Sequence, residues 1–197
     1  MGKKSIRLTI VLALLLSMAL SLSASAMTIK TSSKMTEGTA KKCQLALNAY
    51  TKVALDIISG LKDAYSKDLI SIIQGANIDL SKSPSFNAMK KRVTKQIKKL
   101  NKQKFSGVSN DMKKALQLSE SMGKEVLELL EETSRPLSLT DAANTAKSAL
   151  SSIRKLYAKL VKSGNKALSP YGLKIAKAEE VSASFDSAAG MLANLPV

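Results

Sequence analysis

The residue types that most often perform catalysis are scarce in this 197-residue chain. It contains no histidine, the commonest general base and metal ligand in enzymes, and only one cysteine, Cys43. Catalysis by a serine-histidine or cysteine-histidine pair within the chain is therefore excluded, and a zinc site is strongly disfavoured. A Gly-rich loop with the spacing of a phosphate-binding loop is also missing. We therefore expect no enzyme, no cofactor and no metal site.

Serine-lysine catalysis is the one nucleophilic chemistry that this composition leaves open, because Ser-X-X-Lys occurs four times. The pairs are Ser59 with Lys62, Ser121 with Lys124, Ser152 with Lys155, and Ser163 with Lys166. Chance produces such matches in a chain so rich in serine and lysine, and the Ser-Asp-Asn and Lys-Thr-Gly elements that accompany this motif in penicillin-binding proteins are missing. An enzyme is kept only as a formal alternative. A structure in which none of these pairs shares a cleft would count against it.

The strongest local pattern is a run of basic side chains in a region without acidic residues between Asp79 and Asp111. The run consists of Lys90, Lys91, Arg92, Lys95, Lys98, Lys99 and Lys102. On a helix these residues would cover the side opposite a narrow apolar stripe of Phe86, Met89, Val93, Ile97 and Leu100. The pattern predicts a strongly basic amphipathic helix at about residues 84–104, and the seven basic residues are the candidate binding site.

The first 26 residues have the three-part organisation of a secretory signal peptide. A basic start with Lys3, Lys4 and Arg7 precedes an apolar run at residues 8–22 and a small-residue exit at residues 24–26. The apolar run is 15 residues long, whereas a helix that spans a bilayer needs about 20. We therefore predict cleavage after Ala26 and a secreted or periplasmic protein, with an uncleaved membrane anchor as the alternative.

Removal of residues 1–26 would leave 171 residues with 28 Lys and Arg against 15 Asp and Glu, a net charge of +13. This length fits one domain, predicted at residues 36–197, behind a polar and patternless flexible arm at residues 27–35. Because Cys43 is the only cysteine, it cannot form an intramolecular disulfide. It predicts either a buried free thiol or a disulfide-linked dimer.

Apolar residues recur three and four apart through most of residues 36–197, which predicts about five amphipathic helices and no strands. The first helix is expected at residues 36–74, with a kink near Ser59-Gly60 or Ser66. The other helices are expected to begin at Ser83-Pro84, at Ser109 or Asn110, at Ser138 and at Ser169-Pro170, and the fourth is expected to stop at Gly164. Short connections favour antiparallel neighbours, so the predicted fold is an all-α, up-and-down bundle.

Three interpretations of the basic helix remain open. The first is a solvated face, partly neutralised by the glutamates of the next predicted helix, which are Glu120, Glu125, Glu128, Glu131 and Glu132. The second is binding to an anionic membrane surface or a polysaccharide-like polyanion. The third, nucleic acid, is disfavoured because the chain is predicted to be exported and few aromatic residues accompany the charge.

The leading hypothesis is a binding or interaction protein that uses this helix to contact an anionic surface or an acidic partner. A second hypothesis, from a different class, is a carrier of lipid or another hydrophobic ligand on or within the bundle. A ligand-sized apolar cavity would favour the carrier, and a fully packed interior would count against it.

Overall fold

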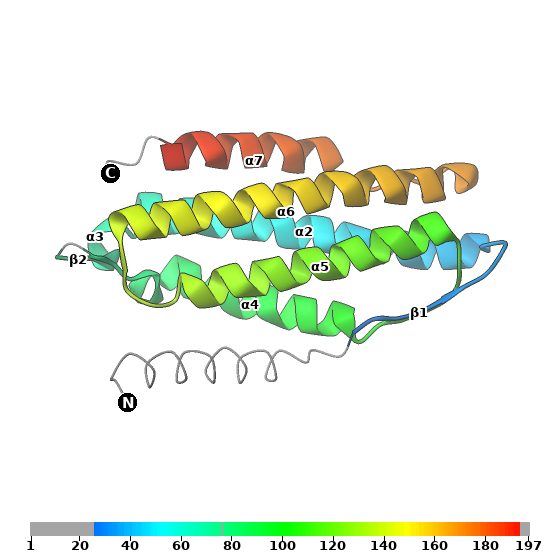
Figure 1. The fold of residues 1–197 in the computed structure, drawn as a ribbon, viewed down its shortest axis with the longest axis horizontal. Helices are drawn as coiled ribbons and strands as arrows, with labels where there is room; N and C mark the ends of the chain where they lie inside the picture. The colour runs from blue at the N-terminus through cyan, green and yellow to red at the C-terminus, as the bar shows by residue number, and fades with distance from the viewer. Residues whose placement is uncertain (1–25, 76, 194–197) are drawn as a thin grey trace, which may run out of the picture.

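The computed structural model describes residues 26–75 and 77–193, and its main elements are long helices (Figure 1). These are α2 (Glu37–Lys67), α4 (Pro84–Asn101), α5 (Asn110–Glu132), α6 (Leu139–Leu168) and α7 (Ala178–Ala193). Successive long helices run in alternating directions along the long axis of the molecule. The prediction of a helical bundle is confirmed. The predicted signal peptide lies, apart from Ala26, outside the described residues.

The long helices pack in two main pairs. Helix α4 lies along α2, and α5 lies along α6, while α7 rests on α2 and α6. Contacts of α4 with α5 are fewer than those of either helix with its main partner. The pairing decides the surroundings of each helix: α4 meets the bundle mainly through α2, and α5 meets it mainly through α6.

Serine residues begin three of the long helices, as the sequence predicts. The hydroxyl oxygen of each accepts a hydrogen bond from a free backbone N–H in the first turn: Ser83 from Phe86, Ser109 from Met112 and Ser138 from Asp141. Pro84 occupies the first position of α4, where its missing N–H costs nothing. These caps fix where α4, α5 and α6 begin.

Two small sheets at the ends of the bundle correct the prediction that the chain has no strands. Strand β1 (Thr28–Thr31) pairs in parallel with β4 (Lys104–Val108), so that Ile29 lies beside Phe105. The prediction of an arm without regular structure at residues 27–35 is therefore wrong for residues 28–31. Threonine, isoleucine, phenylalanine and valine favour extended backbone, and the buried side chains of Met27 and Met35 hold the segment at both sides.

Helix α2 ends at Lys67, before the predicted end at Gln74. The carboxylate of Asp68, the next residue, accepts hydrogen bonds from the Ser83 hydroxyl and from the backbone N–H of Ser85, at 3.0 Å, at the start of α4. This contact draws the chain away from the axis of α2, and α3 (Leu69–Ile72) follows as a single turn. The three-stranded sheet of β2 (Ile73–Gln74), β3 (Asn77–Ile78) and β5 (Leu137–Ser138) then closes this end of the bundle.

The last part of the chain differs from the prediction in two places. Gly164 does not end its helix: α6 continues to Leu168. The glycine allows close packing instead, since a Cβ atom at this position would lie 2.7 Å from the side chain of Ile175. Ser169-Pro170 does not open a helix either. It lies in a short 3₁₀ turn, η2 (Ser169–Tyr171), followed by Gly172 at a left-handed φ of 65°, and α7 begins only at Ala178.

The apolar stripes of the helices form one core. All five stripe residues predicted for the basic helix are buried, from Phe86 to Leu100. Cys43 is fully buried as a free thiol, and burial raises its pKa to about 11. Of the two states predicted for this cysteine, the structure agrees with the buried thiol.

A substitution at Gly60 of α2 tests how closely α2 and α4 pack. A Cβ atom at this position would lie 2.5 Å from Cγ of Met89 in α4, so Gly60→Ala requires the two helices to shift. The cost of overpacking, about 1–3 kcal/mol, should exceed the gain in helix propensity of up to about 1 kcal/mol. We expect Gly60→Ala to lower the free energy of unfolding by about 1 kcal/mol in urea titrations. Gly38→Ala, on the same helix with open space around it, is the control and should not destabilise the protein; equal stability of both variants would contradict this packing.

The Asp68 contact predicts a pH dependence of stability. Hydrogen bonds from Ser83 and Ser85 lower the pKa of Asp68, so the folded state holds this proton less tightly than the unfolded state does. The stabilisation is present above the unfolded pKa of about 3.9 and is lost as the pH falls through the lower folded value. Asp68→Asn should therefore have a lower urea midpoint than the parent protein at pH 7, and the difference should shrink at pH 3. A difference that stays constant over this range would contradict the assignment.

Candidate functional site

The orientation of α4 about its own axis is fixed by polar contacts as well as by its apolar stripe. Asn101, buried at the end of α4, accepts a hydrogen bond of 2.7 Å from the hydroxyl of Tyr50 in α2. Gln96, near the middle, donates a hydrogen bond of 3.0 Å from Nε2 to the backbone oxygen of Ala49. The two residues flank the apolar stripe, one on each side of it, so they hold the stripe against the core and leave the basic side facing solvent.

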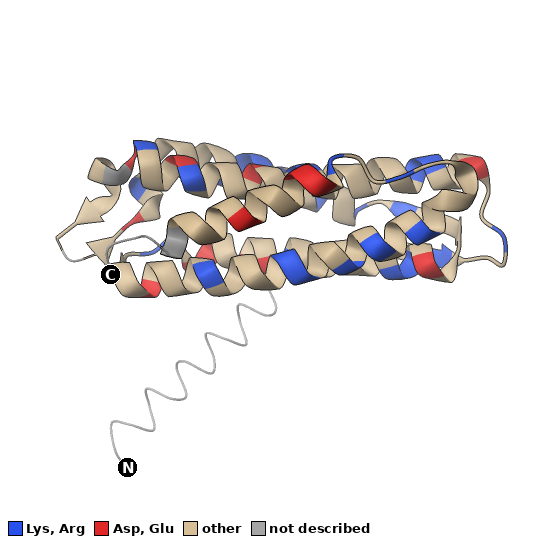
Figure 2. Ribbon diagram, turned by 90° about the horizontal axis from the view of Figure 1, so that it is seen from above, with Lys and Arg blue, Asp and Glu red and all other residues tan. Residues whose placement is uncertain are grey.

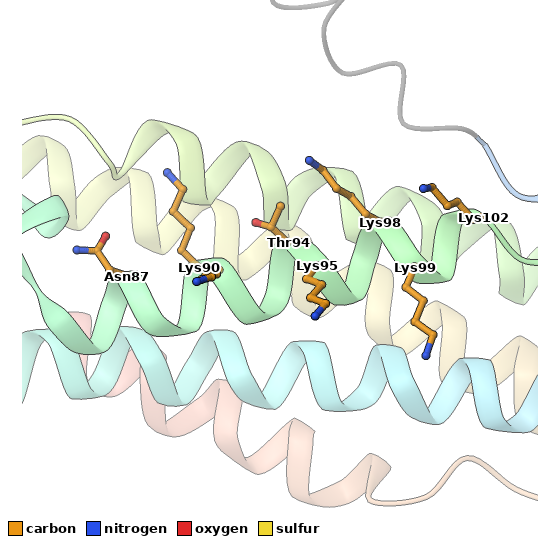
Figure 3. Close-up of a pocket in the computed structure, with 8 residues that line it drawn as sticks. Asn87, Lys90, Thr94, Lys95, Lys98, Lys99 and Lys102 are labelled. Atoms are coloured by element: carbon orange, nitrogen blue, oxygen red, sulfur yellow. The ribbon is translucent and has the colours of Figure 1, made fainter.

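Six of the seven predicted site residues lie along this outer side of α4, and Lys90 lies at its edge, where it contacts Ser134. Lys90 is half-buried and the other six are exposed. Figure 3 shows Lys90, Lys98 and Lys102 reaching to one side of the helix, and Lys95 and Lys99 reaching to the side where α2 lies. With Asn87 and Thr94, the lysines border an open groove along the helix. A single helix is convex, so this groove is an exposed surface between long side chains, not an enclosed pocket.

Two of the seven residues have partners within the bundle. Nε of Arg92 lies 3.3 Å from Oδ2 of Asp56 in α2, which makes an ion pair. Nζ of Lys90 donates a hydrogen bond of 2.6 Å to the hydroxyl of Ser134, just beyond α5. The remaining five have no ion pair with any residue that the structure describes. We call these five the α4 lysine face: Lys91, Lys95, Lys98, Lys99 and Lys102.

The glutamates of α5 do not neutralise the α4 lysine face. Glu125, Glu128 and Glu132 line a cleft of about 430 Å³ whose other wall is α6. Burial raises the pKa of Glu128, and the negative charges of Glu125 and Glu132 raise it further. Among residues 26–75 and 77–193, no ion pair joins α4 to α5. Three of the five glutamates therefore face α6, the main partner of α5. Glu120 instead pairs with Lys124 of its own helix at 4.0 Å.

Sequence reasoning missed a second basic surface, on α6. Lys147, Lys155, Lys159 and Lys162 are exposed there. Two further cations of this helix are paired: Arg154 with Asp186 at 2.6 Å, and Lys166 with Asp111 at 3.0 Å. Figure 2 shows Lys and Arg recurring along the helices. The sequence does indicate this second basic surface, because no acidic residue lies between Asp141 and Glu179.

One of the four Ser-X-X-Lys pairs does share a cleft. Ser59 and Lys62 both line the opening between α2 and α7, whereas Ser152 lines the cleft between α5 and α6 without Lys155. A serine-lysine catalyst needs a desolvated lysine that is neutral enough to act as the base. Lys62 is exposed, and no hydrogen bond joins it to the Ser59 hydroxyl in the described structure. The arrangement supplies no activated nucleophile.

Comparison with protein-family models, curated proteins and solved structures finds no match to this chain. Within the described residues, no helix has both the length and the apolar character needed to cross a bilayer. The same residues hold no group of three or more His, Cys, Asp or Glu side chains placed to bind a metal ion. We take the α4 lysine face, whose five exposed lysines have no ion pair among the described residues, as the candidate site.

The isolation of the α4 lysine face predicts that its charge contributes little to stability. Replacing four of its lysines by glutamine, at residues 91, 95, 98 and 102, should change the free energy of unfolding by no more than about 1 kcal/mol in urea titrations, because solvated side chains are removed. If the lysines were paired with the α5 glutamates instead, several ion pairs of up to about 1 kcal/mol each would be lost. A clear loss of stability would therefore contradict the geometry described above.

Proposed function

We propose that this protein is an exported binding protein that docks on a polyanionic surface through the α4 lysine face. The observation that carries the proposal is that five exposed lysines on one helix have no ion pair among the described residues, while the other side of that helix is held in the core. The first interpretation, a solvated face that is partly neutralised by α5, is weakened because no ion pair joins α4 to α5 among the described residues. Glu125, Glu128 and Glu132 face α6 instead. A dense array of negative groups attracts such unpaired positive charge most strongly.

The spacing of the lysines fits an extended surface better than a compact ligand. Lys91, Lys95, Lys98 and Lys102 recur four and three residues apart, so they follow one side of α4 over about 16 Å. Each lysine beside an anionic lipid surface contributes about 1 kcal/mol of attraction. Lysine ammonium groups on flexible stems act as point charges, so recognition depends on charge density more than on a fixed arrangement of acceptors. Anionic lipid headgroups and acidic polysaccharides both supply such density.

The surroundings of the lysines favour contact by charge alone. Every apolar stripe residue of α4 is buried, so α4 can meet a membrane surface without inserting side chains into it. The only aromatic residue of α4 is Phe86, which is fully buried, so the face offers no ring on which a base of single-stranded nucleic acid could stack. An acidic protein would meet the same lysines, and it is the alternative partner.

Export is part of the proposal. Residues 1–26 have the organisation of a signal peptide, and cleavage after Ala26 would leave β1, which begins at Thr28, and all later described elements intact. A secreted or periplasmic protein meets lipid headgroups and acidic polysaccharides directly. The net charge of +13 after cleavage would add long-range attraction to such surfaces.

The proposal predicts that charge reversal on α4 removes binding. The variant with glutamate at positions 91, 95, 98 and 102 should lose retention on immobilised heparin and on vesicles containing phosphatidylserine. Retention of the parent protein should fall steeply with added salt, because exposed charges are screened within about 8 Å at physiological ionic strength. Circular dichroism of the variant checks that the helices remain.

A matched variant separates the α4 lysine face from net charge. Glutamate at the exposed lysines of α6, residues 147, 155, 159 and 162, changes the net charge by the same amount on a different helix. We expect this variant to retain most of its binding. Equal loss in both variants would show that net charge alone is responsible, and unchanged binding of the α4 variant would end the proposal. Binding to neither heparin nor vesicles by the parent protein would leave an acidic protein as the partner to seek.

A further inference from the structure

A cleft of about 390 Å³ opens between α2 and α7, away from the α4 lysine face. Its apolar lining comes from both helices: Leu55 and Ile58 from α2, and Ala188 and Met191 from α7. Its polar lining includes hydroxyl groups and the ammonium group of Lys62. The volume lies within the range of about 300–1,000 Å³ that is typical of small-molecule sites.

The cleft stays open because α7 is fastened to α6 and presents small residues to α2. On the α6 side, the ring of Phe185 lies 6.2 Å from that of Tyr157, and Asp186 pairs with Arg154. Toward α2, α7 presents Ser184, Ser187 and Ala188, whose short side chains leave the space between the helices unfilled. The opening therefore follows from the composition of α7 and from its attachment to α6.

The charges at the cleft are uneven. Glu180 pairs with Lys177 at 3.2 Å, whereas Lys62 has no ion pair among the residues that the structure describes. Because α2 and α7 run in the same direction, residue numbers rise together along both walls (Figure 1). Lys62 and Met191 therefore lie toward one end of the cleft, and Glu180 lies toward the other. The cleft offers an apolar wall with an uncompensated positive charge near one end.

We propose that this cleft binds a small amphiphile with an apolar body and an anionic head group, such as a medium-chain fatty acid. The apolar body would lie along Leu55, Ile58 and Met191, where methionine adapts to different shapes. The head group would lie beside Lys62 and accept hydrogen bonds from the nearby Ser59 hydroxyl and the ammonium group. The site needs no opening of the bundle and does not use the α4 lysine face.

Isothermal titration calorimetry with dodecanoate, kept below the concentration at which it forms micelles, tests the proposal. The parent protein should bind it, and Ser184→Phe or Ser187→Phe, each of which fills the cleft, should weaken binding by about tenfold or more. Two filling variants are used so that the result does not depend on one of them folding, which circular dichroism verifies. No binding by the parent protein, or unchanged binding by both folded variants, would overturn the proposal.

A separate pair of variants tests whether the anionic head group lies beside Lys62. Lys62→Met should weaken dodecanoate binding by up to about fivefold, the range of an exposed ion pair, and should leave binding of neutral dodecanol unchanged. Lys52→Met is the matched control, because Lys52 is an exposed lysine of α2 that does not line the cleft. Equal effects of Lys62→Met and Lys52→Met would overturn the anionic head group. Loss of dodecanoate binding in the α4 glutamate variant, but not in the filling variants, would place the ligand on the α4 lysine face instead.

Discussion

The packing of α4 against α2 is the constraint on which the rest of this structure depends. Gly60 allows Met89 to approach the backbone of α2, and the buried hydrogen bond from Tyr50 to Asn101 fixes the far end of α4. A polar pair inside an apolar contact tolerates little rotation, because a turned helix would leave both groups without partners. The seam between α2 and α4 therefore decides which residues of α4 meet solvent.

The distribution of charge over the surface follows from which helices pack together. Since α4 lies along α2 and α5 lies along α6, the basic and acidic residues of consecutive helices face different neighbours. One interpretation of the sequence is that α5 partly neutralises α4, but in the bundle the lysines of α4 face solvent and Glu125, Glu128 and Glu132 line a cleft with α6. The five lysines of the α4 lysine face thus have no ion pair with the acidic residues that follow them in the sequence, among the residues that the structure describes.

Much of the architecture and part of the candidate site could be predicted from local patterns. The apolar stripe of α4 and the serine caps depend on near neighbours in the chain, so the sequence shows them directly. The end of α2 at Asp68, the pairing of β1 with β4 and the passage of α6 through Gly164 depend on residues far away in the chain. The pairing of Arg92 with Asp56 and the cleft beside α7 are equally non-local, which is why spacing in the sequence does not reveal them.

The parallel pairing of β1 with β4 has a consequence for the order in which the chain assembles. Thr28 lies beside Lys104, so the whole of α2 and α4 lies inside the loop that this pairing closes. Closing so long a loop costs entropy that only prior placement of both helices can offset. We therefore expect β1 to pair with β4 late in folding, after α2 and α4 have packed together, so that the backbone of residues 28–31 stays unpaired until then.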